Sequence, residues 1–155
     1  MFCSDIIMEF LPNVHLLGAL TMVYTIVFKV KALIPIYLYV GLTGLFAGFA
    51  LWWWPYLYVW TVLWGGAMLL PKRMPKKVAC VVYPVVCSIH GFAFGVLYAP
   101  AQAFMYGFDF REMLAWIVAG LPFDVIHGVS NFVAGLLVFP LSQLLLRLVK
   151  GNNRA

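Results

Sequence analysis

Apolar residues run through this chain with so few interruptions that it has little polar surface to present to water. Of its 155 residues, 65% are hydrophobic and only 10% are charged, which is far from the balance of a water-soluble domain. A membrane-spanning helix needs roughly 20 apolar residues, so this length has room for about six short spans. We therefore predict an all-α membrane protein, a compact bundle of about six transmembrane helices in the lipid bilayer.

The few charged residues are mostly basic and gather in two places. The net charge is +5, and it comes mainly from the loop at 72–77 and from the segment Arg147 to Arg154. Charge of this kind sets membrane topology and binds lipid headgroups, so we predict no nucleic-acid partner. The three cysteines, Cys3, Cys80 and Cys87, have no metal or redox spacing. We interpret them as small packing residues and predict no metal site and no cofactor.

The chain divides into three predicted parts. They are an interfacial N-terminal segment at 1–13, one transmembrane helical domain at 14–148 and a basic C-terminal tail at 149–155. No Lys or Arg precedes Lys29, so we expect no secretory signal peptide. Predicted spans cover 14–30, 32–50, a third that ends at 70, a fourth that starts near 78, a fifth between 100 and 121, and a last at 123–148. The fifth is short and partly polar, so a tilted, broken or re-entrant segment also fits.

The positions of the basic residues conflict with six spans. Six crossings put the basic loop at 72–77 and the basic tail on opposite sides of the membrane, whereas the positive-inside rule favours one side for both. Five crossings satisfy the rule if residues 99–121 do not cross. The family resemblance described below favours six.

Three polar side chains, Asp124, His127 and Asn131, interrupt the last apolar stretch. If Pro122 lies in the first turn of a helix that runs to about Leu146, their i, i+3, i+7 spacing gathers them on one face. Such side chains in a membrane usually face a bundle interior or a cavity, and they indicate a functional site. Each also has a structural alternative: the carboxylate can cap the helix, the amide can bond a neighbouring helix, and the imidazole can be packed.

The sequence resembles the substrate-binding (S) components of energy-coupling factor transporters. The resemblance covers about Val14 to Leu148 and rests on the aromatic turn Trp-Pro-Tyr-Leu-Tyr-Val-Trp60, on His90-Gly-Phe-Ala-Phe-Gly95 and on Ala-Gly-Leu-Pro-Phe-Asp-Val-Ile-His-Gly-Val-Ser-Asn131. It implies a multi-pass protein of the prokaryotic plasma membrane, with six helices and both termini in the cytoplasm. It also implies capture of a vitamin or similar micronutrient, and partnership with a transmembrane coupling subunit and two cytoplasmic ATPases.

A pocket for such a ligand is expected to be mostly apolar and aromatic, with a few convergent polar groups. Aromatic walls favour a planar, ring-containing ligand. The candidate polar contacts are Asp124, His127, Asn131, His90, Tyr98 and Gln102, and the candidate walls are Trp54, Tyr56, Trp60, Trp64 and Trp116.

Catalysis has little support in the sequence, and we predict that the chain is not an enzyme. There is no Walker loop and no recognisable nucleophile arrangement, and only His90 with Asp124 could be proposed as a catalytic pair. Two other functions stay open. One is a free-standing, Trp-rich membrane receptor or sensor for a planar ligand. The other is a small proton-coupled transporter that uses Asp124, His127 and His90 as a relay.

Overall fold

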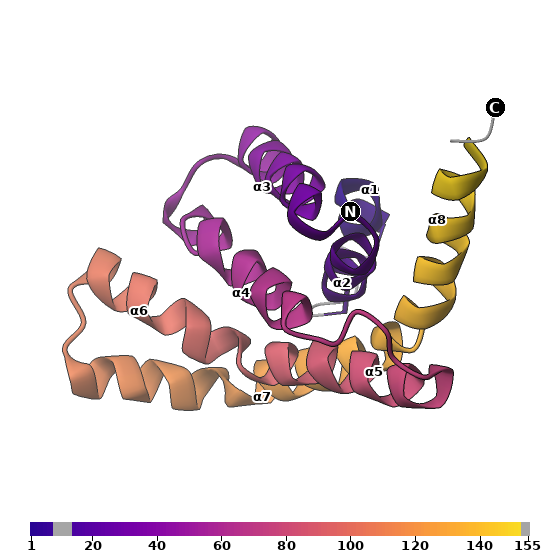
Figure 1. The fold of residues 1–155 in the computed structure, drawn as a ribbon. Coiled ribbons are helices and arrows are strands. Elements are labelled where there is room, and N and C mark those ends of the chain that lie inside the picture. Colours follow the sequence, from indigo (N-terminus) through magenta and orange to yellow (C-terminus); the bar gives the residue numbers. More distant parts are fainter. Residues whose placement is uncertain (8–13, 153–155) are drawn as a thin grey trace.

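Helices are the regular elements in the part of the chain that the structure, a computed structural model, describes, namely residues 1–7 and 14–152 (Figure 1). The predicted all-α class is confirmed for these residues. The predicted interfacial segment and basic tail lie partly outside them. In chain order the elements are α1 (Phe2–Ile7), α2 (Leu17–Phe28), the 3-10 turn η1 (Lys29–Ala32), α3 (Leu33–Ala47), the 3-10 turn η2 (Leu51–Trp53), α4 (Tyr56–Met68), α5 (Lys76–Phe92), α6 (Phe94–Tyr106), α7 (Phe110–Gly135) and α8 (Val138–Asn152).

The outer surface of the bundle is apolar. Large side chains such as Phe46 on α3, Phe104 on α6 and Phe123 on α7 are exposed, Phe104 to 89%. Three helical runs, Leu17–Ala47, Lys76–Tyr106 and Phe110–Gly135, are long and apolar enough to cross a membrane. An exposed apolar surface is stable in lipid, and helices satisfy their own backbone hydrogen bonds there. These features support a membrane protein.

The first half of the bundle consists of three short helices, α2, α3 and α4, in which each helix is antiparallel to the one before it. The chain reverses after α2, where Lys29 has a positive φ of 56°. The carbonyl of Lys29 accepts the indole N–H of Trp64 at 3.1 Å, which ties this turn to the end of α4. Midway along α3, the carbonyl of Val40 accepts the indole N–H of Trp53, which precedes α4, at 2.8 Å. These bonds set α3 antiparallel to α4, and α2 parallel to it.

The second half is a long helical hairpin in which α5 and α6 lie against α7 (Figure 1). Helix α6 ends at Gly107, whose φ of 70° is left-handed and suits glycine. Helix α7 then begins with a capping box, in which Asp109 and Glu112 each accept the other's backbone N–H at 2.8 Å. Since a glycine stop and a capping box follow each other directly, the turn is short and the helices are antiparallel.

Residues 100–121 are broken at Gly107 into the end of α6 and the start of α7, as the broken alternative predicts, because Gly107 and the capping box reverse the chain there. The prediction about the last helix is wrong. Pro122 lies inside α7 rather than in the first turn of a helix, and that helix ends at Gly135 rather than near Leu146. Local periodicity does not reveal this, because apolar residues continue on both sides of each boundary.

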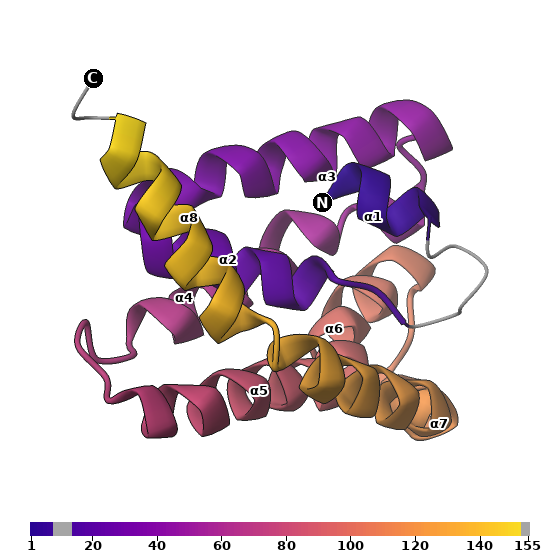
Figure 2. The same ribbon diagram turned by 90° about the vertical axis from the view of Figure 1, so that its right-hand side faces the viewer.

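The described chain passes along the bundle five times, as α2, α3, α4, α5 with α6, and α7 with α8. One groove includes Lys29 after α2, Lys72 before α5 and Leu146 on α8, so both basic clusters lie at the same end. In Figure 2 the start of α5 and the C-terminal end of α8 lie on the left, and the start of α7 on the right. Phe2 packs on Phe46 at the end of α3, with ring centroids 4.7 Å apart. Helix α1 therefore lies at the end of the bundle opposite to the basic loop and the end of α8. The family resemblance instead implies that both termini lie on one side of the membrane.

Helices α5 and α7 approach closely along two facing rows of small or polar residues. A Cβ at Gly91 would lie only 2.8 Å from the Cα of Gly128, and one at Gly135 only 2.6 Å from the Cα of Pro84. The hydroxyl of Ser88 donates to the carbonyl of Gly128 at 2.9 Å across the same interface. Small residues permit such close packing in lipid. The two rows, each repeating at +4, +7 and +11, are Pro84, Ser88, Gly91 and Gly95 on α5 and α6, and Asp124, Gly128, Asn131 and Gly135 on α7.

Single cysteines test the five-pass arrangement. With Cys3, Cys80 and Cys87 replaced by alanine, a membrane-impermeant maleimide is expected to label Lys72→Cys and Lys150→Cys from one side of sealed vesicles, and Arg111→Cys from the other. Labelling of the two lysine positions from opposite sides would contradict five passes.

Adding one methyl group tests the close helix approach. We expect Gly91→Ala to lower the thermal unfolding midpoint in detergent, since the new Cβ meets backbone atoms of α7 and the helices must separate at a cost of about 1–3 kcal/mol. Gly120→Ala is the matched control, because a Cβ there meets open space and alanine favours a helix by roughly 1 kcal/mol. A midpoint that falls equally in both variants would refute the glycine interface.

Candidate functional site

Helix α7 carries Asp124, His127 and Asn131 on the face that it buries, as their spacing predicts. Asp124 is 6% exposed, His127 is 2% exposed and Asn131 is fully buried. They lie where the start of α6 and the interior ends of α2 and α5 meet α7, at the close approach described above. The structure therefore brings together three side chains that sequence spacing alone placed on one face.

The carboxylate of Asp124 caps a helix, although not its own. Its Oδ1 accepts the backbone N–H of Gly95 at 3.0 Å, in the first turn of α6. The first N–H groups of a helix have no partner within the helix, and the positive end of the helix dipole favours a carboxylate there. The second oxygen, Oδ2, has no hydrogen-bond partner within the described residues. A Cβ at Gly95 would collide with this carboxylate, so the site requires glycine there.

Asn131 lies between glycines of two neighbouring helices. A Cβ at Gly18 on α2 would be 3.3 Å from Asn131 Oδ1, and one at Gly91 on α5 would be 2.9 Å from Asn131 Nδ2. Neither atom of the amide has a hydrogen-bond partner among the residues that the structure describes. The amide is therefore held in place by packing while its donor and acceptor are left for another group.

All three histidines of the chain converge on this region. The ring of His127 packs edge-on against His15, which precedes α2, with centroids 4.7 Å apart, and it also contacts Phe94 at 4.7 Å. Trp60 on α4 lies between His15 at 5.9 Å and His90 at 5.8 Å. His90 Nε2 is 3.0 Å from the carbonyl of Val59, which fixes its ring against α4. Five separate segments, the one before α2 and helices α4, α5, α6 and α7, thus meet around these rings.

This buried polar cluster, which we define as Trp60, His90, Asp124, His127 and Asn131, holds polar atoms without partners. Within the described residues these atoms are Trp60 Nε1, His90 Nδ1, Asp124 Oδ2, His127 Nε2, Asn131 Oδ1 and Asn131 Nδ2. A buried polar group without a hydrogen bond costs roughly 1–3 kcal/mol, and native proteins keep few of them. Their concentration in one place is therefore the strongest structural indication of a binding site. The mixture of donors and acceptors suits a small polar molecule.

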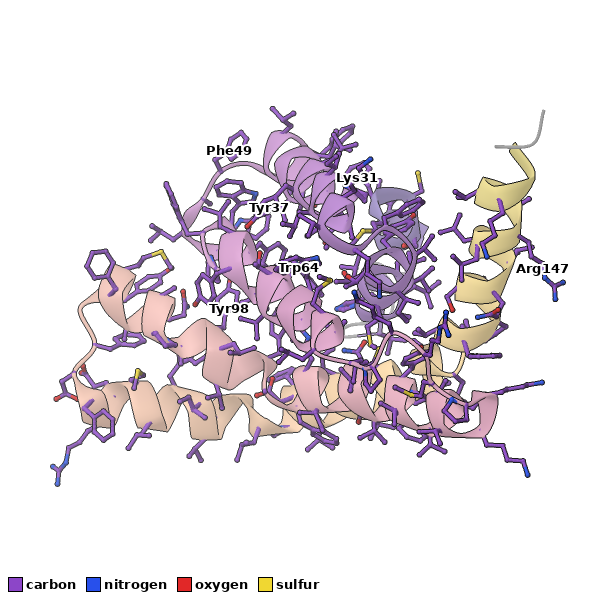
Figure 3. All side chains as sticks on the ribbon, viewed as in Figure 1. Lys31, Tyr37, Phe49, Trp64, Tyr98 and Arg147 are labelled. Carbon is purple, nitrogen blue, oxygen red and sulfur yellow. The ribbon has the colours of Figure 1, made fainter. Side chains whose placement is uncertain are left out.

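Aromatic rings continue from the cluster along α6. His90, Phe94 and Tyr98 follow one another at i+4 spacing, and the Phe94 and Tyr98 rings stack at 5.8 Å. Tyr98, which is labelled in Figure 3, also stacks on Trp116 of α7 at 6.1 Å, and its hydroxyl donates to the carbonyl of Trp52. Tyr56 joins this row at 6.4 Å from Tyr98 and 6.0 Å from Trp60. Three further predicted site residues, Tyr56, Tyr98 and Trp116, therefore form one aromatic wall with the cluster.

Three predicted site residues lie elsewhere. Trp64 donates to the carbonyl of Lys29 near the basic end of the bundle, and Trp54 is half-exposed in a separate apolar hollow with Phe104. Gln102 lies one helical turn beyond Tyr98, and its Oε1 is buried without a hydrogen-bond partner in the described structure. Trp60 and Trp64 share one face of α4 and pack in the same apolar core, but the indole N–H of Trp64 bonds the turn after α2 instead of lying in the polar cluster.

Sequence reasoning did not include His15 and Phe94 in the site. The i+4 spacing of His90, Phe94 and Tyr98 is a signal that could have found Phe94. No local pattern indicates His15, which reaches His127 from a segment more than a hundred residues away. His15 also lines a largely apolar hollow of about 540 Å³ with Ser130 and Leu137, so it connects the cluster to the surface of the bundle.

The comparisons with known proteins give no further guide to this site. No family model matches the chain, and neither a curated protein nor a solved structure matches it. The arrangement of these side chains therefore has to carry the functional argument.

Replacing a polar group that has no partner by an apolar one of similar size is expected to stabilise the protein without ligand. We predict that Asn131→Leu raises the thermal unfolding midpoint of the ligand-free protein by a few degrees. Thr25→Val is the control, because the Thr25 hydroxyl is equally buried but donates to the carbonyl of Thr21 at 2.7 Å. Circular dichroism melts in detergent measure both. A fall in both midpoints would show that the Asn131 amide is satisfied in the free protein.

Proposed function

We propose that this protein is a membrane-embedded binding protein for a small, ring-containing polar molecule, held by the buried polar cluster. The observation that carries the proposal is the concentration of polar atoms without partners at the junction of α4, α5 and α7. A ligand with both donors and acceptors would satisfy Asp124 Oδ2, the Asn131 amide and His127 Nε2 together. Trp60 and Phe94 would supply apolar walls for its ring.

More specifically, we propose that the protein is the substrate-binding subunit of an energy-coupling factor importer. The support is the sequence of the segment that ends at Asn131, which resembles the closing helix of S components and contains Asp124, His127 and Asn131. The ligand in this proposal is a vitamin, a vitamin precursor or a purine-like ring. Uptake would then require a transmembrane coupling subunit and two cytoplasmic ATPases.

A free-standing membrane receptor for a planar ligand is the second candidate. Two observations favour it: the chain passes along the bundle five times, and α1 lies at the end opposite to the basic loop at 72–77. The same cluster would bind the ligand in both cases. The two candidates differ in their partners, because the receptor needs no coupling subunit or ATPase.

Affinity purification of the tagged protein from its native membrane separates these candidates. Mass spectrometry of the eluate would detect co-purifying proteins and retained small molecules in one experiment. A coupling subunit recovered with two ATPases supports the importer, whereas the protein alone with a bound ring compound supports the receptor. Recovery of neither partner nor ligand, from cells grown without an external supply of vitamins, would count against both.

Substitutions in the cluster test the binding site itself. We expect Asp124→Ala and Asn131→Ala each to reduce the retained ring compound at least tenfold at unchanged expression, because each removes a hydrogen bond to the ligand worth about 1.5 kcal/mol or more in a buried site. Thr25→Ala, which removes a buried hydroxyl that is not part of the cluster and bonds the carbonyl of Thr21, should retain it. Equal retention in all three variants would place the ligand elsewhere.

A further inference from the structure

A second concave site lies at the basic end of the bundle, away from the buried polar cluster. It is a groove of about 730 Å³ between the ends of α2 and α4, the start of α5 and the side of α8. One part of its lining is cationic, from Lys29, Lys72 and Arg73, and another part is apolar, from Met74, Phe139 and Leu146. A volume of this size accommodates a ligand as large as a drug molecule. The groove is therefore amphipathic, with charge and apolar surface side by side.

The three cations have no carboxylate opposite them within the described part of the chain. The whole protein has five acidic residues. Asp109 and Glu112 are used in the capping box of α7, and Asp124 caps α6. Among the described residues, none of the groove's lining side chains is acidic. Among the described residues, the groove therefore presents positive charge without a facing carboxylate, which an anion can neutralise.

The apolar lining of the groove has an exposed apolar neighbour. Leu69, beside the lining residue Leu70, is 87% exposed on the outer surface. A soluble anion gains nothing from such a wall, whereas the acyl chain of a phospholipid does. Eight of the ten Lys and Arg residues lie in the segments that meet at this end, or directly beside them. The positive-inside rule places such an end in the cytoplasmic leaflet, where anionic lipids are enriched.

We propose that this groove is a binding site for an anionic phospholipid. Lys29, Lys72 and Arg73 contact the phosphate and headgroup, and Met74, Phe139 and Leu146 contact the upper part of an acyl chain. The site is independent of the buried polar cluster, so it holds whether or not the protein is an importer subunit. Because α2, α4, α5 and α8 all line the groove, a bound lipid bridges the two halves of the bundle.

Native mass spectrometry of the detergent-purified full chain, titrated with dioleoyl-phosphatidylglycerol or dioleoyl-phosphatidylcholine, tests this site. We expect the anionic lipid to bind at least about tenfold more tightly, and the triple variant Lys29→Gln, Lys72→Gln, Arg73→Gln to lose that preference, since each basic residue near a lipid surface contributes roughly a factor of five. The matched control is Lys31→Gln, Lys76→Gln, Lys77→Gln, which removes the same charge at the same end from residues that do not line the groove.

Each outcome is decisive. Loss of preference in the groove variant with retention in the control supports the site. Equal binding of the two lipids, or equal loss in both triple variants, overturns it, because net charge alone then accounts for the binding. Displacement of the lipid by glycerol phosphate at comparable concentration would show a soluble-anion site and overturn the lipid assignment. If the triple variant does not fold, Lys72→Gln and Arg73→Gln singly, on the exposed loop, should each weaken the preference several-fold.

Discussion

The close approach of α5 and α7 is the contact on which the rest of the bundle depends. Glycine at 91, 128 and 135 lets the two backbones come together, and Ser88 adds a hydrogen bond across the interface. Because no bulky side chain separates the helices, Asp124 reaches the first turn of α6 and Asn131 reaches between α2 and α5. In lipid there is no hydrophobic drive to bring helices together, so close packing and hydrogen bonds of this kind must supply it.

The packing that stabilises the bundle also buries polar groups without giving them hydrogen-bond partners. Asn131 is held by glycines on both sides, and His127 by His15 and Phe94. These contacts fix the positions of the side chains while their polar atoms are left without partners within the described residues. Buried polar groups without partners lower the stability of the free protein. Such groups are typical of ligand-binding sites, because side chains already held in place lose little freedom on binding.

The two ends of the bundle differ in charge, and this follows from its five passes. The reversal at Lys29 and the loop at 72–77 lie at the end that Leu146 also reaches, so the basic segments meet there. The conflict between the positive-inside rule and six crossings disappears once residues 100–121 are a hairpin. The buried polar cluster and the basic groove therefore occupy different regions of one small bundle, with α4 and α5 contributing to both.

The sequence by itself determined the helical class, the apolar outer surface and the buried face of α7, because composition and the spacing of Asp124, His127 and Asn131 act within single helices. It did not determine where helices end inside a continuous apolar run. A glycine or a proline can end a helix or lie inside one, and here α6 ends at Gly107 while α7 continues through Pro122. Tertiary structure decided that His15 meets His127, that Trp64 bonds the carbonyl of Lys29 and that Asp124 caps α6. Those contacts join segments far apart in the chain, and they depend on how closely the glycines let the helices pack.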